Sequence, residues 1–207
     1  MRRYLISGIG TDVGKTVASA VVAMAWGADY WKPVQTGAGS DSDRLTIERL
    51  TGGRVRCYPE VFALPRPVSP DAAAASEGVR ISLEAIVAAQ PVHTNPLIIE
   101  GAGGLMVPLN EEELIVDLAT ALDASIVLVS RHYLGSINHT LLSSYYLRER
   151  GLSVAGILFV GDPHRETEDS IRRFSGLPII GRIPWFNSPS PESVTEASQN
   201  LALSGYS

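Results

Sequence analysis

A glycine-rich loop between an apolar segment and a helical pattern is the feature that most restricts how this chain can fold. The apolar run Tyr4–Ser7 leads into the loop Gly8–Thr16, which reads GIGTDVGKT, and a helical pattern follows directly. In such a loop the glycines let backbone N–H groups converge on phosphate oxygens, and the positive end of the helix dipole favours an anion. The order of strand, loop and helix therefore predicts a phosphate-binding α/β fold.

The rest of the chain continues the same alternation. Six short segments rich in Ile, Val and Leu are predicted strands: Tyr4–Ser7, Asp29–Trp31, Leu97–Glu100, Ile126–Val129, Val154–Val160 and Ile179–Ile183. Seven longer segments are predicted helices: Lys15–Trp26, Ser42–Leu50, Leu83–Ala89, Glu113–Leu122, Ser136–Arg148, Glu166–Phe174 and Ser190–Leu203. Alternation of this kind indicates βαβ units, and the near-absence of charges indicates strands buried on both faces. We predict a P-loop NTPase fold, with a mostly parallel sheet flanked by helices on both faces.

Length and charge limit the possible functions. A chain of 207 residues predicts a single domain, residues 1–207, and a net charge of −5 argues against a nucleic-acid or anionic-membrane surface. No apolar run approaches the ~20 residues of a membrane span. The single cysteine, Cys57, permits no intrachain disulfide, which fits a cytoplasmic protein. The four prolines of Pro59–Pro70 predict an irregular surface segment.

The loop departs from the strict Gly-x4-Gly-Lys-[Ser/Thr] spacing, because five residues separate Gly8 from Gly14 and Ile9 stands where that spacing requires glycine. Its chemistry is nevertheless complete. Lys15 is expected to reach the β- and γ-phosphates, and the Thr16 hydroxyl to bind Mg²⁺. The predicted nucleotide-binding residues of the loop and the following helix are Gly10, Thr11, Asp12, Val13, Gly14, Lys15, Thr16 and Val17.

Charged residues stand at the ends of two other predicted strands, where ligands bind to an open parallel sheet. Lys32 follows the second strand, and an ammonium there would attract a carboxylate, carbamate or phosphate. Asp41 and Asp43 follow a glycine-rich turn, and either could bind a divalent cation, while Asp41 or Ser42 could also cap a helix. Glu100 ends an apolar strand, as Walker-B acidic residues do.

Together these segments resemble the dethiobiotin synthetases, over the span from Ser7 to Trp185. The phosphate loop carries the family's Thr11–Thr16 pattern, and the segment Lys32–Gly37 (KPVQTG) resembles its second motif. The segment Glu100–Gly104 (EGAGG) resembles the third motif, and Leu134–His139 (LGSINH) matches a further family segment. Each motif alone is of moderate specificity, whereas their joint occurrence in this order is specific.

The resemblance implies roles for individual residues. The expected catalytic residues are Lys15 and Lys32. The expected Mg²⁺ ligands are Thr16, Glu100 and Asp43, with Asp43 preferred to Asp41. The expected substrate-binding residues are Thr36, Glu100, Gly101, Gly135 and Asn138, with the segment around Asn138 acting across a homodimer interface. Pro184 and Trp185 are expected beside the nucleotide base. Locally, Ser136 reads as the N-cap of a helix.

The implied reaction consumes ATP with Mg²⁺. CO2 and one amine of 7,8-diaminopelargonic acid form a carbamate, the carbamate attacks the γ-phosphate, and the second amine then closes the ring and releases phosphate. Relatives usually carry an asparagine that recognises adenine where this chain has Val160. Because a valine side chain cannot hydrogen-bond to a base, we expect weak base discrimination.

Two alternatives remain from the sequence. One is another amide-forming P-loop synthetase, although a chain of this length lacks the glutaminase domain of such enzymes. The other is a nucleotide switch of the partitioning type, whose signature lysine would stand where this chain has Gly10.

Overall fold

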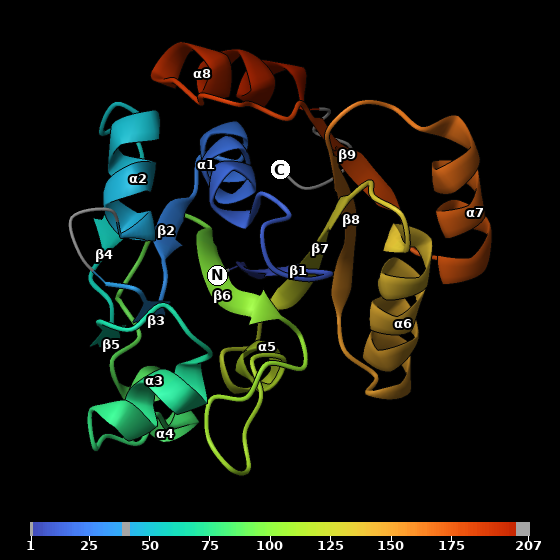
Figure 1. The fold of residues 1–207 in the computed structure, drawn as a ribbon. Coiled ribbons are helices and arrows are strands. Elements are labelled where there is room, and N and C mark those ends of the chain that lie inside the picture. Colours follow the sequence, from blue (N-terminus) through green and yellow to red (C-terminus); the bar gives the residue numbers. More distant parts are fainter. Residues whose placement is uncertain (1, 39–41, 202–207) are drawn as a thin grey trace.

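The computed structural model describes residues 2–38 and 42–201, so the candidate Asp41 lies outside the described residues. Seven strands form a parallel sheet in the order β4-β2-β6-β1-β7-β8-β9 (Figure 1). Two further strands, β3 and β5, form a small parallel sheet of their own. The strands are β1 (Arg3–Gly8), β2 (Asp29–Trp31), β3 (Val34–Thr36), β4 (Cys57–Tyr58), β5 (Phe62–Leu64), β6 (Leu97–Gly104), β7 (Ser125–Arg131), β8 (Val154–Val160) and β9 (Ile179–Ile183).

Helices cover both faces of the large sheet. Helices α1, α2 and α8 pack together over one face, and α3 to α7 lie over the other (Figure 1). Their bounds are α1 (Lys15–Ala25), α2 (Asp43–Leu50), α3 (Pro70–Ser76), α4 (Leu83–Ala88), α5 (Asp117–Ala121), α6 (Ser136–Glu149), α7 (Arg165–Ser175) and α8 (Pro191–Asn200). No helix in these described ranges is long and apolar enough to cross a membrane.

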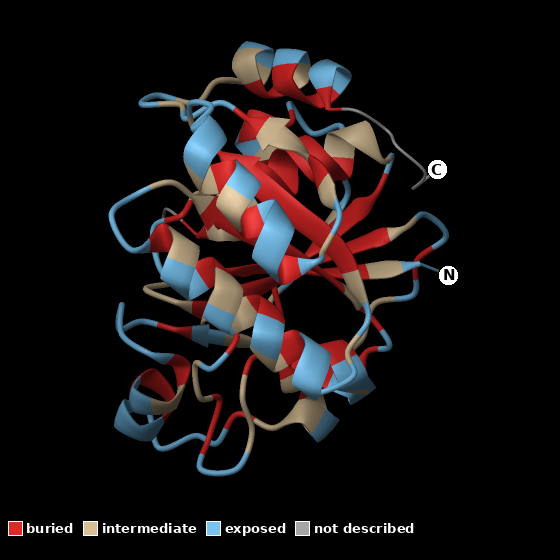
Figure 2. Ribbon diagram, turned by 90° about the vertical axis from the view of Figure 1, so that its right-hand side faces the viewer, coloured by how far each residue is buried: buried red, intermediate tan, exposed pale blue. Residues whose placement is uncertain are grey.

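The strands are buried on both sides because successive side chains point to opposite faces. In β1, Leu5 belongs to the core beneath α3 to α7, and Ile6 to the core beneath α1, α2 and α8. Ile99 and Ile98 of the neighbouring β6 divide in the same way. Figure 2 shows the result, a buried sheet between helices whose outer sides are exposed. The predicted fold class is therefore confirmed.

Most predicted elements are present, and β2, β8 and β9 have the predicted bounds. The prediction of an irregular segment over Pro59–Pro70 is wrong in part, because residues 62–64 form β5 and α3 begins at Pro70. The predicted helix Glu113–Leu122 is shortened to α5, because Leu114 instead forms an antiparallel bridge with Pro108. The strands β3, β4 and β5 have only two or three residues each, too few for a periodic pattern to indicate them.

The topology gathers one edge of the sheet into a single region. β1 is central, with β6 on one side and β7 on the other, and β2 lies beyond β6. Because all four strands are parallel, their carboxyl ends meet at the same edge. The phosphate loop after β1, Lys32 after β2 and Glu100 in β6 therefore come close together although they are far apart in the sequence.

Candidate active site

A cleft of about 940 Å³ opens at this edge of the sheet. Its walls come from the phosphate loop, the segment after β2, the first residue of α2, the loop before α3, and the ends of β6, β7 and β9. The structure brings eleven of the predicted site residues into the lining of this cleft: Thr11, Asp12, Gly14, Lys15, Thr16, Val17, Lys32, Thr36, Asp43, Glu100 and Trp185.

The phosphate loop accommodates its additional residue by bonding to the neighbouring strand. The Ile9 backbone N–H donates to the Val129 carbonyl of β7 at 3.0 Å, so this residue belongs to the base of the loop. Gly8 must be glycine, because a Cβ there would lie 2.6 Å from Val13 Cγ2. Gly14 caps α1 with φ at 88°, in the left-handed region that favours glycine. The longer loop thus still ends in a helix N-terminus that faces the cleft.

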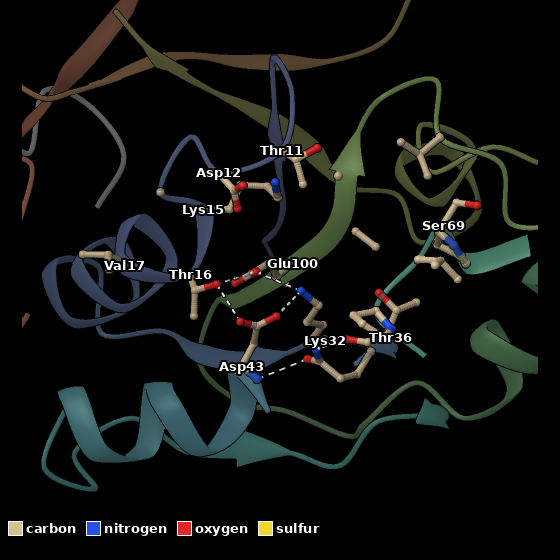
Figure 3. Close-up of a pocket in the computed structure, with 18 of the residues that line it drawn as sticks. Thr11, Asp12, Lys15, Thr16, Val17, Lys32, Thr36, Asp43, Ser69 and Glu100 are labelled. Atoms are coloured by element: carbon tan, nitrogen blue, oxygen red, sulfur yellow. Dashed lines mark hydrogen bonds and ion pairs between the residues drawn. The ribbon is translucent and has the colours of Figure 1, made fainter. Parts of the chain in front are cut away.

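Four side chains from separate elements converge at the centre of the cleft (Figure 3). The Thr16 hydroxyl of α1 lies 2.8 Å from Asp43 Oδ1 and 3.0 Å from Glu100 Oε1, and with one hydrogen it can donate to one of them at a time. Lys32 Nζ donates to Asp43 Oδ2, and to Glu100 Oε1 at 3.1 Å. The ammonium thus links α2 to β6 directly beside the phosphate loop.

Two side chains that the sequence analysis did not identify hold these carboxylates in place. The fully buried Tyr30 hydroxyl donates to Glu100 Oε2 at 3.1 Å. Gln35 Oε1 accepts from the Asp43 backbone N–H at 3.1 Å, and its Nε2 donates to the Thr36 carbonyl at 2.8 Å. Tyr30 reaches Glu100 because β2 pairs with β6, and no pattern in the sequence indicates which strands pair.

For both Lys32 and Asp43, burial and the neighbouring opposite charges shift the pKa in opposite directions. Burial lowers the pKa of Lys32, but Glu100 and Asp43 outweigh it, so the net pKa of Lys32 is raised. Burial likewise raises the pKa of Asp43, but Lys32 and the hydrogen bonds from Thr16 and Gln35 outweigh it, so the net pKa of Asp43 is lowered. The Lys32 ammonium and the Asp43 carboxylate therefore each favour the charged form of the other.

Lys15 lies at the opposite side of the same cluster. Its Nζ donates to the Gly10 carbonyl at 3.2 Å, which folds the side chain back over the loop. Burial lowers the pKa of Lys15, and the attraction of Glu100 offsets this shift only in part. A partly desolvated ammonium in this position is suited to a phosphate, which would replace the lost water with charge-assisted hydrogen bonds.

Six predicted residues lie outside the lining of the cleft. Val13 is buried against Gly8, Gly10 accepts a hydrogen bond from Lys15 Nζ through its carbonyl, and Pro184 precedes the lining residue Trp185. Gly101 is buried instead in packing, because a Cβ there would lie 2.9 Å from Ile115 Cγ2. The other two, Gly135 and Asn138, are exposed on the surface of the chain. The proposed ligand roles of all six stay predictions.

Two local predictions were wrong. Glu100 does not end its strand, since β6 continues to Gly104 and the carboxylate lies within the sheet. Ser136 is not a helix N-cap, because Gly135, with φ at 103°, takes that position and Ser136 is the first, buried residue of α6. Glycine is frequent in turns, so the glycines after Glu100 suggested that the strand ended there, yet they continue β6. Gly135 likewise is not part of a separate turn but the cap of α6.

The sequence analysis also missed part of the lining. Gln35, Ala102, Gly103, Val107, Arg131 and the segment Pro67–Pro70 all line the cleft. For Arg131 a signal was available, because it ends a buried strand of a parallel sheet, where ligand-binding residues gather. For Ser69 and Pro70 the signal was their resemblance to a family segment near the substrate, from which Asp71 departs, whereas Pro67 and Val68 carried no signal.

We expect the substitution Lys32→Met to lower the free energy of unfolding by about 3 kcal/mol at pH 7, because it leaves two carboxylates close together without their buried cation. Because the folded-state pKa of Asp43 is lowered from its ordinary value of 3.8, the contribution of this ion pair is fully present above pH 3.8 and is lost as the pH falls through the lowered folded-state pKa. The difference between variant and wild type, measured by urea denaturation, should therefore be smaller at about pH 3 than at about pH 7.

A matched control is Arg80→Met, which removes an arginine that pairs with Glu111 and Glu112 at the exposed surface. Its effect should stay within about 0.5 kcal/mol. Equal effects of the two substitutions, or a pH-independent effect at Lys32, would contradict a buried charge pair.

Comparison with known proteins identifies relatives of this arrangement. Residues 2–193 match a family model described as an AAA domain. The chain is 47% identical over 190 residues to the ATP-dependent dethiobiotin synthetase of Christiangramia forsetii, covering 90% of each chain. It is also 47% identical over 207 residues, all of both chains, to the ATP-dependent dethiobiotin synthetase of Cytophaga hutchinsonii.

Among solved structures, a ParA family ATPase from Chlorobium tepidum is similar with a TM-score of 0.60 and 16% identity. The match covers 95% of this chain and 90% of that one. At this identity the likeness shows the P-loop NTPase fold alone, whereas the two synthetases match through both sequence and length. The chain therefore belongs to the dethiobiotin synthetase family.

Proposed function

We propose that this protein is an ATP-dependent dethiobiotin synthetase, a ligase of biotin biosynthesis that acts on 7,8-diaminopelargonic acid and CO2. Membership of the family supports this activity. The observation in the structure that carries it is the Lys32 ammonium, which lies against Asp43 and Glu100 inside the cleft of the phosphate loop. A nucleotide-binding protein needs the loop, but a second buried lysine beside it indicates chemistry on an anion.

In the proposed reaction, one amine of the substrate adds to CO2 and loses a proton to give a carbamate. A carbamate oxygen attacks the γ-phosphorus of ATP, and ADP leaves. The second amine then attacks the carbamate carbon, so that a C–N bond closes the ring and phosphate leaves with one oxygen of CO2. Lys15 and Lys32 are placed to offset negative charge on the carbamate and the transferring phosphoryl group, because both ammoniums face the same cleft.

The oxygens of Thr16, Asp43 and Glu100 fit a Mg²⁺ ion. They provide a hydroxyl and two carboxylates whose oxygens lie 2.8 and 3.0 Å from the Thr16 hydroxyl, and Mg²⁺ prefers hard oxygen ligands. Bound there, Mg²⁺ would neutralise charge on the phosphate oxygens. Tyr30 and Gln35 hold the two acidic residues in position through their hydrogen bonds to Glu100 and Asp43.

We further propose a homodimer in which α6 and the loop before it face the partner's cleft. Gly135 and Asn138, predicted to bind the substrate, are exposed and lie outside their own cleft. Large apolar side chains are exposed around them, with Leu134 at the loop and Leu142 at 61% exposure on α6, and Met106 at 57%. Grouped exposed apolar side chains are typical of an interface. Substrate contacts from Asn138 would then require a second copy of the chain.

Two further expectations concern the domain organisation and the location of the protein. A single domain over residues 1–207 and a cytoplasmic location are consistent with one family match over most of the chain and with a lone, reduced Cys57. Burial raises the pKa of the Cys57 thiol to about 12, which leaves it unreactive. A partitioning switch has less support, because the likeness to a ParA family ATPase rests on the fold.

The proposed activity predicts that release of phosphate from ATP depends on the diamine and CO2. We expect Lys32→Met to lower kcat/KM by at least about a hundredfold, since preorganised charge on the reacting groups is lost. Substrate-dependent phosphate release and product mass would be measured together, with Arg80→Met as the control for surface charge. Phosphate release that ignores the diamine, or full activity of Lys32→Met, would contradict the proposal.

Base discrimination gives a second prediction. Val160 is buried, and its Cγ1 lies 3.3 Å from the Cβ position of Gly14, so its side chain packs beneath the loop and offers the base no hydrogen bond. We expect kcat/KM for ATP, CTP and GTP to agree within about tenfold, and Val160→Asn to shift the ratio towards ATP by about tenfold.

The control for added polarity is Val92→Asn at a residue that is 91% exposed. A strong preference of the unmodified protein for ATP would show that backbone groups or other side chains recognise the base instead of position 160.

The proposed homodimer predicts that Leu142→Glu shifts the protein towards the monomer and lowers kcat/KM, because a charge is placed in an apolar interface. Sedimentation velocity at micromolar concentration measures the assembly, and Val92→Glu serves as an exposed control outside α6. A monomeric wild-type protein with full activity would be incompatible with the dimer.

A further inference from the structure

Arg131, the last residue of β7, joins three segments at one end of the cleft. Its guanidinium lies 3.5 Å from the centre of the Trp185 ring, in a cation–π contact with the loop after β9. Its Nη1 donates to the backbone carbonyl of Asp12 in the phosphate loop at 3.3 Å. Both Arg131 and Trp185 line the cleft.

These contacts place the guanidinium beside the part of the loop that binds phosphate. Asp12 lies two residues before Gly14, the N-cap of α1, and the N-terminus of a helix favours an anion. The Trp185 ring also touches this region, because its Cζ3 lies 3.5 Å from the Cβ position of Gly14. The guanidinium of Arg131 thus lies over an indole whose edge contacts the loop.

The charge of Arg131 is not matched within the described part of the chain. Three cationic side chains line the cleft, and of these Lys32 pairs with Asp43 and Glu100. No described carboxylate forms an ion pair with Arg131, whose hydrogen bond to Asp12 goes to a neutral carbonyl. A guanidinium has five N–H donors in one plane and no acceptor, so its other donors suit an anion with several oxygens.

We propose that Arg131 is a nucleotide-binding residue that donates hydrogen bonds to phosphate oxygens of the bound nucleoside triphosphate, with the Trp185 ring fixing the plane of the guanidinium. This role rests on the proposed use of ATP, but it does not depend on which reaction follows. The stacking interaction restricts the rotamers of the arginine, so less conformational entropy is lost when the phosphates bind.

The test measures binding, so that it stays separate from the test of catalysis. Dissociation constants for ATP, GTP and CTP would be measured by displacement of a fluorescent ADP analogue, at 50 mM and 500 mM salt, for wild type, Arg131→Met and Arg131→Lys. Arg131→Met keeps a long side chain against Trp185 without charge, and Arg131→Lys keeps the charge without the planar fork.

We expect Arg131→Met to weaken binding at low salt about tenfold to a hundredfold, the range of one charge-assisted contact. The loss should be equal for the three nucleotides, because their phosphates are identical. It should shrink at high salt through screening, and Arg131→Lys should recover part of it.

Three results would overturn the proposal. If the loss of affinity differs among ATP, GTP and CTP, Arg131 contacts the base instead of the phosphates. If the loss of affinity does not depend on salt and Arg131→Lys does not restore it, Arg131 acts on the structure of the loop. Unchanged binding by Arg131→Met would exclude any role in nucleotide binding. If binding changes as expected while no dethiobiotin forms, the proposed reaction fails and the role of Arg131 stands.

A matched control is Arg56→Met, where Arg56 lies 4.9 Å from the centre of the Tyr58 ring and outside the cleft. It removes the same kind of arginine–aromatic contact, and nucleotide binding should change by less than about twofold. Thermal unfolding of each variant would show that the comparison is made between folded proteins.

Discussion

The contact between one buried ammonium and two carboxylates is the interaction on which the rest of the site depends. Lys32 follows β2, Asp43 begins α2 and Glu100 lies within β6, so this contact ties α2 to the paired strands β2 and β6. Desolvation of such a group opposes its charge, and the raised pKa of Lys32 shows that the two carboxylates overcome that cost. Replacing a buried charge cluster with apolar side chains is often neutral or stabilising, so this cluster by itself is weak evidence for a role in stability.

The arrangement of the sheet makes this contact possible. In a parallel sheet every strand ends at the same edge, so residues separated by up to 84 positions, such as Thr16 and Glu100, come within 3.0 Å. The two apolar cores on either face hold the strands rigidly, and side chains supported on such elements keep their geometry better than side chains on free loops. Tyr30 and Gln35 add a second set of hydrogen bonds behind the reacting groups.

The cleft has two chemically distinct ends. At one end acidic and basic side chains balance one another around Thr16 and Lys32, where phosphoryl transfer would occur. At the other end Arg131 lies against the Trp185 ring and donates to the Asp12 carbonyl of the phosphate loop.

The sequence alone was sufficient for the local elements and for the central residues of the site. The order of apolar strand, glycine loop and helix depends on contacts between neighbours in the chain, so Gly14, Lys15 and Thr16 were predicted in the loop and helix start where the structure has them. Lys32 and Glu100 were predicted at the sheet edge where ligands bind, and Asp43 from the resemblance, and the structure brings all three into one cleft. Short strands such as β4 and β5 escaped prediction, because two or three residues carry no periodic signal.

Strand order and the long connections were decided only by the tertiary structure. The pairing of β2 with β6 brings the Tyr30 hydroxyl to Glu100, and the return of the loop after β9 brings Trp185 to Arg131. The tertiary structure also leaves Gly135 and Asn138 exposed outside their own cleft, and it packs Gly101 into the core. These contacts join residues far apart in the chain, and their formation depends on the simultaneous burial of both sheet faces, which no local pattern of residues encodes.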